Sequence, residues 1–114
     1  MTPNTPYRLL TPTLDDILAA RQRIAGVALR TPLIRLAPEP GEPEIWLKLE
    51  TLQPIGSFKI RGAASALGLV PHDELARGVY TASAGNMAQG VAWWARKAGV
   101  PCAVVVPDTA PSAK

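Results

Sequence analysis

The chain has 114 residues and a mass of 12.1 kDa, which is enough for about one domain. Its formal charge is +3, and the scattered basic residues lack the clustering typical of nucleic-acid binding. One cysteine and one histidine exclude a disulfide framework and a multi-histidine metal site. The first ten residues contain no apolar run of the length that a signal peptide needs, and the longest apolar run, at 103–106, is too short to span a membrane. We therefore expect a cytoplasmic protein without a bound metal, nucleic acid or membrane.

The first 43 residues predict one helix between irregular segments. Residues 1–12 are rich in Pro and Thr and predict an extended arm. Thr13 predicts a helix start, because its hydroxyl can accept the amide hydrogen of Asp16. Residues 31–43 contain four prolines and predict an irregular stretch. The predicted helix has one apolar stripe, formed by Leu14, Ile17, Leu18, Ile24 and Ala25.

From residue 45, strand and helix patterns alternate. Alternating side chains predict a strand over 45–49, and Ser57 predicts the cap of a helix that runs to about Leu69. A short strand follows at 79–81, then a helix that Asn86 caps and Gly99 closes. Residues 103–106 form a β-branched run, typical of a strand buried on both faces. Residues 109–114 predict the start of another helix.

This alternation favours an α/β fold with parallel strands joined by helical crossovers. Ligands bind such sheets at the carboxyl ends of the strands. Two loops follow strand ends, at residues 51–57 and 83–86. We expect the chemistry of the protein there.

The first loop leads into Lys59, which lies in the first turn of a predicted helix. The helix dipole disfavours a cation there by about 0.3–1 kcal/mol, and Arg61 adds like-charge repulsion. Both effects favour a neutral amine, the form that a nucleophilic lysine needs. The plain alternative is a solvated surface lysine.

The second loop contains Ser83, Ala84, Gly85, Asn86 and Met87. Its backbone amides can converge at a helix N-terminus and make an anion site suited to a carboxylate. The plain alternative is an ordinary helix cap. The sequence contains no Gly-x-Gly-x-x-Gly and no Walker-type loop. We interpret His72 as a solvated turn residue and Cys102 as an inert small hydrophobe.

Two segments in this order carry a family resemblance: Gly56-Ser57-Phe58-Lys59-Ile60-Arg61-Gly62-Ala63, and Ser83-Ala84-Gly85-Asn86-Met87-Ala88-Gln89-Gly90. With them, the chain resembles threonine dehydratases (threonine ammonia-lyases), in the pyridoxal-phosphate family that also holds serine dehydratase and serine racemase. The resemblance implies an incomplete three-layer α/β fold with a parallel sheet, of the tryptophan-synthase-β-like type (fold type II).

The resemblance also implies residue roles. Lys59 would bond covalently to pyridoxal 5'-phosphate, and Phe58 would lie against its ring. Asn86 would hydrogen-bond the phenolic oxygen of the cofactor. The substrate, L-threonine or L-serine, would place its carboxylate against Ser83, Ala84, Gly85, Asn86 and Met87. For threonine, the products would be 2-oxobutanoate and ammonia.

Three positions refine the resemblance. Ile60 stands where threonine synthases tend to carry Asp, and this favours the dehydratase and racemase branch. Ile55 stands where Thr is usual in the family, and Met87 stands where His is common. The departure at Met87 changes the side chain that is expected beside the substrate carboxylate.

Because family catalytic domains are much longer, the resemblance implies an N-terminal part of such an enzyme. Residues 1–43 would be an arm and a helix that pack on a large lobe, and residues 44–114 would be part of a small lobe. The phosphate-binding loop would lie beyond Lys114. We expect little turnover from this polypeptide alone and self-association in the complete enzyme. The alternative of another class is a non-catalytic, truncated or split-gene product that serves as a binding or assembly module.

Overall fold

The computed structural model describes residues 11–112, so most of the expected N-terminal arm lies outside the described residues. Helix α1 (Leu14–Arg23) begins at Thr13, as predicted. The amide of Asp16 donates to Thr13 Oγ1 (3.2 Å), and the amide of Thr13 donates to Asp16 Oδ2 (2.8 Å). This reciprocal pair satisfies amides that the first turn would otherwise leave free. The backbone hydrogen bond from Thr13 also lowers the pKa of Asp16.

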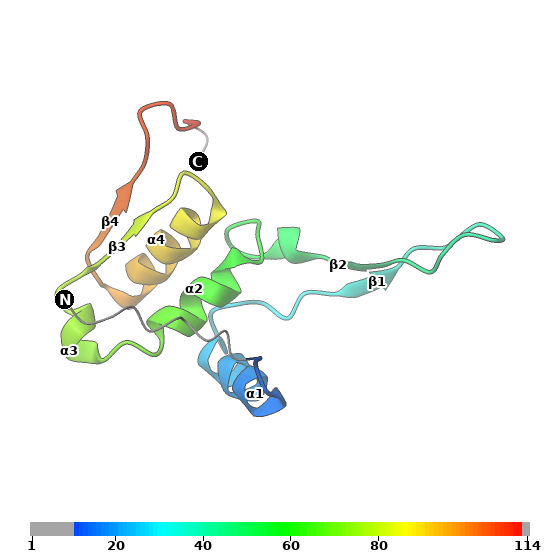
Figure 1. Cartoon of the computed structure of the whole chain (residues 1–114), viewed down its shortest axis with the longest axis horizontal. Helices are drawn as coiled ribbons and strands as arrows, with labels where there is room; N and C mark the ends of the chain where they lie inside the picture. The colour runs from blue at the N-terminus through cyan, green and yellow to red at the C-terminus, as the bar shows by residue number, and fades with distance from the viewer. Residues whose placement is uncertain (1–10, 113–114) are drawn as a thin grey trace, which may run out of the picture.

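A projecting hairpin replaces the irregular stretch that the prolines predict. Strand β1 (Leu33–Arg35) pairs antiparallel with β2 (Trp46–Lys48), and Ile34 lies opposite Leu47. The predicted strand at 45–49 therefore exists, but it is not part of the parallel sheet. The radius of gyration, 17.7 Å, exceeds the roughly 13 Å typical of 100 residues, and Figure 1 shows the hairpin extending away from the helices.

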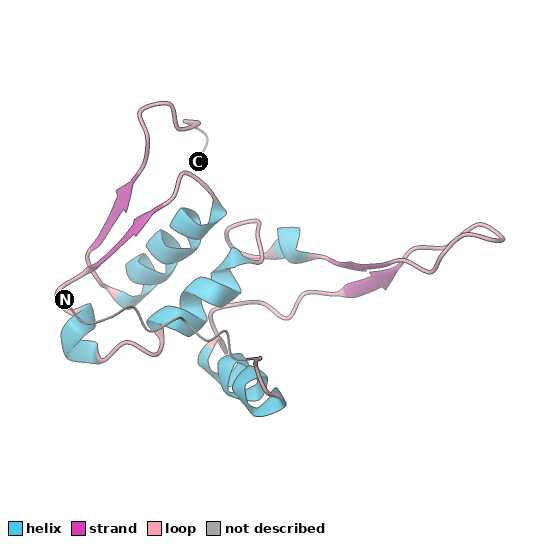
Figure 2. Cartoon of the chain, viewed as in Figure 1, coloured by secondary structure: helices cyan, strands magenta, loops and turns pink. Residues whose placement is uncertain are grey.

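The parallel sheet contains β3 (Val79–Ala82) and β4 (Cys102–Val105), joined by the crossover helix α4 (Asn86–Ala98). Val79 is paired with Cys102 and Ala82 with Val105. Gly99 closes α4 with a left-handed backbone (φ 69°), as predicted. Figure 2 shows the two strand pairs on opposite sides of the helices.

Short helices connect these parts. A 3₁₀ helix, η1 (Glu50–Leu52), follows the hairpin and leads to α2 (Lys59–Leu67). Helix α3 (His72–Leu75) then leads to β3, so His72 begins a short helix. Residues 108–109 form a turn and no helix begins between 109 and 112; residues 113–114 lie outside the described part. Among the described residues, no helix is both long and apolar enough to cross a bilayer.

The core lies mainly between α2 and α4, and Leu75 of α3 adds to it. Its buried apolar residues are mostly small, so the two helix backbones approach closely: Ile60, Ala63, Ala64, Leu75, Ala88, Val91 and Ala95. Helix α4 covers one face of the β3–β4 pair.

The expectation that residues 103–106 are buried on both faces is wrong for this structure. Val105 is 61% exposed, and Tyr80 on the neighbouring strand is 83% exposed. The apolar stripe of α1 is also uncovered, since Leu14 and Ile17 are 69% and 57% exposed. An apolar run predicts which side chains favour burial, but burial needs a covering element, and the described residues supply one for a single face of the sheet.

Candidate active site

Lys59 is the first residue of α2, at the end of a tight turn. Gly56 adopts a left-handed backbone (φ 65°), and its amide donates to Gln53 O (2.7 Å). Ser57 is buried, and its hydroxyl accepts the amide hydrogen of Lys59 (3.3 Å). Phe58, rather than Ser57, occupies the cap position. The turn thus fixes the backbone of Lys59 while leaving its long side chain free to reach outward.

The amine of Lys59 lies over an aromatic ring. Its Nζ is 5.0 Å from the centroid of Phe58, whose side chain is 57% exposed. An aromatic face attracts a cation, which opposes the effect of the helix dipole on this amine. The pair presents a primary amine and an open, flat apolar face together. This combination fits an aromatic aldehyde such as pyridoxal phosphate.

The second loop, Ser83 to Met87, connects β3 to α4. The amide of Ser83 donates to Val105 O (3.1 Å), and the amide of Gly85 donates to Ser83 Oγ (3.2 Å). The structure corrects one prediction here: Gly85 is the N-cap of α4, and Asn86 is the first helical residue. The cap position requires an extended backbone, which Gly85 adopts (φ −130°).

The backbone amides of Asn86, Met87 and Ala88 find no acceptor within residues 11–112. They stand at the positive end of a 13-residue helix. A cavity of about 320 Å³ opens beside them, lined by Ser83, Ala84, Ala88, Val104, Val106, Ala110, Pro111 and Ser112. Free amides at a helix start beside a cavity fit a carboxylate ligand.

Gly90 allows α4 to pack closely against the first turn of α2, which follows the first loop. A Cβ at this position would lie 3.2 Å from Ala63 Cβ and 3.4 Å from Lys59 O. The absent side chain therefore lets α4 approach the first turn of α2, and both helices begin on the same side of the molecule (Figure 1). No hydrogen bond within the described residues joins the Lys59 amine to the second loop. The two predicted groups of site residues are thus brought to the same side of the molecule.

Sequence reasoning missed the polar network behind the first loop. Arg61 Nε and Nη2 donate to the two oxygens of Glu50 (2.8 and 2.7 Å). Thr31 donates to the same carboxylate (2.5 Å), and Gln53 binds both the amide and the carbonyl of Leu29. The hydrogen bond from Arg61 lowers the pKa of Glu50 to about 2. Three chain segments meet at this one carboxylate.

This network corrects the expected effect of Arg61. The sequence predicts repulsion between Arg61 and Lys59, but the guanidinium charge is paired with Glu50. The two residues are also about 200° apart around α2, given about 100° per residue. The sequence signal that could have suggested this pair is an acidic residue near the end of a strand, followed by an arginine inside a helix. Whether the two side chains come together depends on the fold.

No group of three or more His, Cys, Asp or Glu side chains among residues 11–112 is arranged to hold a metal ion.

Residues 24–114 match the family model described as "Pyridoxal-phosphate dependent enzyme". The chain is 45% identical to an L-threonine ammonia-lyase of Thermotoga maritima over 104 residues, which cover 90% of this chain and 26% of the relative. A threonine dehydratase of Staphylococcus aureus is 42% identical over 105 residues, 90% of this chain and 30% of that relative. The chain thus spans between a quarter and a third of the length of these curated relatives.

Solved structures of threonine deaminase and serine racemase are also similar to this chain. The structure of serine racemase from Dictyostelium discoideum superposes with a TM-score of 0.81 at 40% identity, covering 89% of this chain and 34% of that one. The structure of the processed form of threonine deaminase isoform 2 from Solanum lycopersicum superposes with a TM-score of 0.77 at 30% identity, covering 90% and 30%. The α/β architecture with its parallel strand pair is therefore part of the fold type II architecture of these enzymes.

Proposed function

This chain belongs to the pyridoxal-phosphate-dependent enzyme family, and we propose that it forms the amino-terminal part of an ammonia-lyase for hydroxy amino acids. The observation that carries the proposal is the placement of the Lys59 amine over the Phe58 ring, on the same side of the molecule as the free amides of α4. The threonine ammonia-lyase relatives support L-threonine as substrate, with L-serine as the second candidate.

Each site residue has its own proposed role. Lys59 Nζ would hold the cofactor and, once displaced by the substrate amine, move the proton at the substrate Cα as a general base. Phe58 would cover the cofactor ring, and Asn86 would donate to its phenolic oxygen. The free amides of Asn86, Met87 and Ala88, with the Ser83 hydroxyl, would bind the substrate carboxylate, while the Gly85 amide donates to Ser83 Oγ. When bound, pyridoxal phosphate supplies a conjugated ring that accepts the electron pair left at Cα.

The overall reaction would balance without an oxidant or a reductant. The Cα proton and the β-hydroxyl of threonine leave as water, and hydrolysis then returns one water molecule. The products are 2-oxobutanoate and ammonia. In this scheme, Lys59 moves one proton while the free amides of α4 keep the carboxylate fixed.

Serine racemase is the second candidate, favoured by the structural similarity to the Dictyostelium enzyme. Racemisation needs the same first step at Cα and a second proton donor on the opposite face. Detection of D-serine after incubation with L-serine would favour it over the lyase.

The test is covalent trapping in the intact protein. The protein is mixed with pyridoxal phosphate, reduced with borohydride, digested and mapped by mass spectrometry. We expect one adduct at Lys59, which Lys59→Arg abolishes and Lys97→Arg on α4 leaves unchanged. Production of 2-oxobutanoate from threonine then tests the reaction. Adducts spread over several lysines, unchanged by Lys59→Arg, would contradict the proposal and favour a non-catalytic binding or assembly module.

A further inference from the structure

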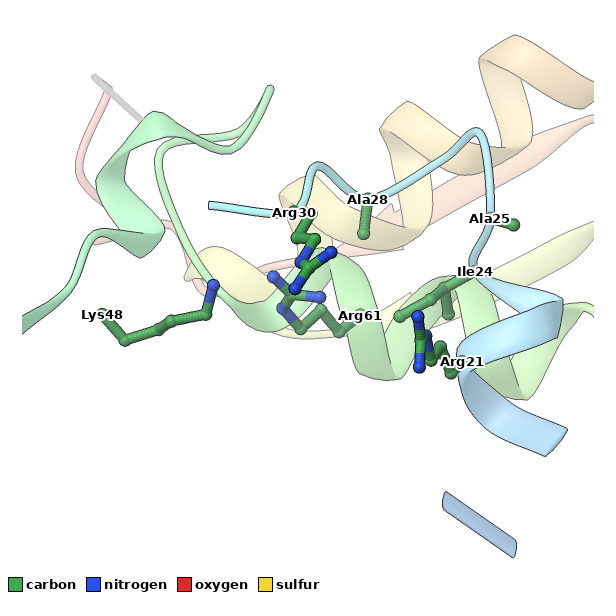
Figure 3. Close-up of a pocket in the computed structure, with 7 residues that line it drawn as sticks. All are labelled: Arg21, Ile24, Ala25, Ala28, Arg30, Lys48 and Arg61. Carbon is green, nitrogen blue, oxygen red and sulfur yellow. The ribbon is translucent and has the colours of Figure 1, made fainter. Parts of the chain in front are cut away.

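The carboxylate of Glu50 is bound by residues that come before and after Lys59 in the sequence. Arg61 donates to both of its oxygens (2.8 and 2.7 Å), and the hydroxyl of Thr31 donates to Oε1 (2.5 Å). Figure 3 shows the side chains of Lys48 and Arg61 extending towards each other, and Glu50 Oε1 lies 3.8 Å from the first and 2.7 Å from the second. Several chain segments therefore hold this one carboxylate in place.

One connection leads from Glu50 to the turn that precedes Lys59. Gln53 Nε2 donates to Glu50 Oε2 (3.1 Å), and Gln53 O accepts the amide hydrogen of Gly56 (2.7 Å). Gly56 has the left-handed backbone that makes the turn (φ 65°). The hydroxyl of Ser57 then accepts the amide hydrogen of Lys59 (3.3 Å). The two side chains along this path, Gln53 and Ser57, are both buried, so the path is shielded from water.

The other connection leads from Glu50 to the helix that follows Lys59. Arg61, two residues further along α2, binds the carboxylate through Nε and Nη2, and Nη2 also donates to Leu29 O (2.9 Å). Arg61 lies about 200° from Lys59 around the helix axis, so it can hold Lys59 only through the helix backbone. The backbone of Lys59 is therefore restrained from both sides by groups that meet at Glu50.

The amine of Lys59 depends on this backbone for its position. Within residues 11–112, Nζ forms no hydrogen bond or ion pair, and it lies 5.0 Å from the centroid of the Phe58 ring. Phe58 belongs to the same turn and is 57% exposed. A displacement of about 1 Å in a reacting group can cost about a hundredfold in rate. The restraint on the turn can therefore control how fast the amine reacts.

We propose that Glu50 and Arg61 are positioning residues that hold the Lys59 amine where it meets the aldehyde carbon of pyridoxal phosphate. This rests on the proposed function, in which Lys59 holds the cofactor. The pair would act as one unit, because removing either side chain leaves the other without its partner. A direct effect of charge would differ, since a negative charge stabilises a protonated amine and a positive charge destabilises it. Removing Glu50 and removing Arg61 would then have opposite effects on the rate, whereas loss of positioning slows the reaction in both.

The test is the initial rate at which pyridoxal phosphate forms an adduct at Lys59 of the intact protein, quenched with borohydride at fixed times and mapped by mass spectrometry. We expect Glu50→Gln and Arg61→Gln each to slow it about tenfold, and the double variant to be no slower. Arg61→Lys should not restore the rate, because lysine lacks the fork that binds both carboxylate oxygens. The pH of half-maximal rate should stay unchanged. Glu44→Gln and Arg35→Gln remove the same charges from another ion pair and should change the rate less than twofold.

A second measurement does not depend on the cofactor. Hydrogen exchange of the Gly56 and Lys59 amides should accelerate in the Glu50 and Arg61 variants more than that of amides in α4. Leu75→Val on α3 removes a buried methylene and controls for lost stability; its adduct rate should stay within twofold of the parent. Unchanged exchange, opposite rate effects in the two variants, or the parent rate in Arg61→Lys would each overturn the proposal. A parent protein without selective trapping at Lys59 would instead contradict the proposed function, and the exchange would still show whether Glu50 restrains the turn.

Discussion

Arg61 on α2 holds Glu50 of η1 through two parallel hydrogen bonds, one to each carboxylate oxygen. Both side chains are partly shielded from solvent, at 31% and 17% exposed. The same guanidinium reaches Leu29 O, so one side chain connects the helix to two preceding segments. This pair therefore fixes the first turn of α2, where Lys59 begins the helix.

Replacing Glu50 should destabilise the protein. In Glu50→Gln the charge of Arg61 loses its partner, and we expect a loss of about 1–3 kcal/mol in the free energy of unfolding. Urea denaturation measures it. The matched control is Glu44→Gln, whose pair with Arg35 is about half exposed, so its loss should stay below about 1 kcal/mol. Equal losses in the two variants would contradict this account.

The same pair predicts a pH dependence. Because the pKa of Glu50 is lowered from 4.5 to about 2 on folding, its stabilisation is complete above about pH 4.5. It is lost as the pH falls towards 2, and the total is at most about 3 kcal/mol because the carboxylate is partly exposed. Urea midpoints at pH 7, 5 and 3 should fall more steeply for the parent than for Glu50→Gln. Parallel profiles would show that Glu50 is not responsible.

Gly90 and Gly62 offer a matched comparison of two helical glycines. Gly90→Ala would place a Cβ 3.2 Å from Ala63 Cβ, so we expect overpacking to cost about 1–3 kcal/mol. Gly62→Ala on α2 meets nothing within 4 Å and should stabilise the protein by about 0.5–1 kcal/mol through helix propensity. Thermal unfolding distinguishes the two. The Gly90 variant should also reduce cofactor trapping at Lys59, whose carbonyl lies beside the added carbon; normal trapping would refute this link.

Gln53 should protect a backbone amide far from it in sequence. Its side chain is 3% exposed, accepts the amide hydrogen of Leu29 (2.9 Å) and donates to the Leu29 carbonyl (2.8 Å). In Gln53→Met, a substitution of similar size, we expect a loss of about 1–3 kcal/mol. Hydrogen exchange of the Leu29 amide should accelerate more than that of amides in α4. Unchanged protection at Leu29 would contradict the assignment.

Local signals predicted the elements that local interactions determine. The Thr13 cap, the strand predicted at 79–81 and the Gly99 helix end each depend on a few neighbouring residues, and all are present, the strand with one further residue. The β1–β2 hairpin was missed because its strands are three residues long and are stabilised by each other across a proline-rich segment. The Glu50–Arg61 pair was missed because it depends on how η1 and α2 meet.

The candidate site also combines features that local sequence predicts with contacts that depend on the fold. Motifs place Lys59 and the 83–87 loop along the chain, and the predicted caps lie one residue from the observed ones, Ser57 instead of Phe58 and Asn86 instead of Gly85. They do not show that Gly90 brings α4 against α2, since that contact is visible only between helices. The role of Lys59 stays a prediction that the trapping experiment tests, and the roles of Phe58 and Asn86 stay predictions.

The parallel pairing of β3 with β4 also sets the order in which the chain can fold. Val79 and Cys102 are separated in the sequence by the whole of α4, so their pairing closes a long loop and carries a cost in loop-closure entropy. We expect β3, α4 and β4 to form as one cooperative unit in the slow step of folding. The β1–β2 hairpin has no share in that sheet, and it can form and open on its own timescale, separately from the unit that carries the free amides.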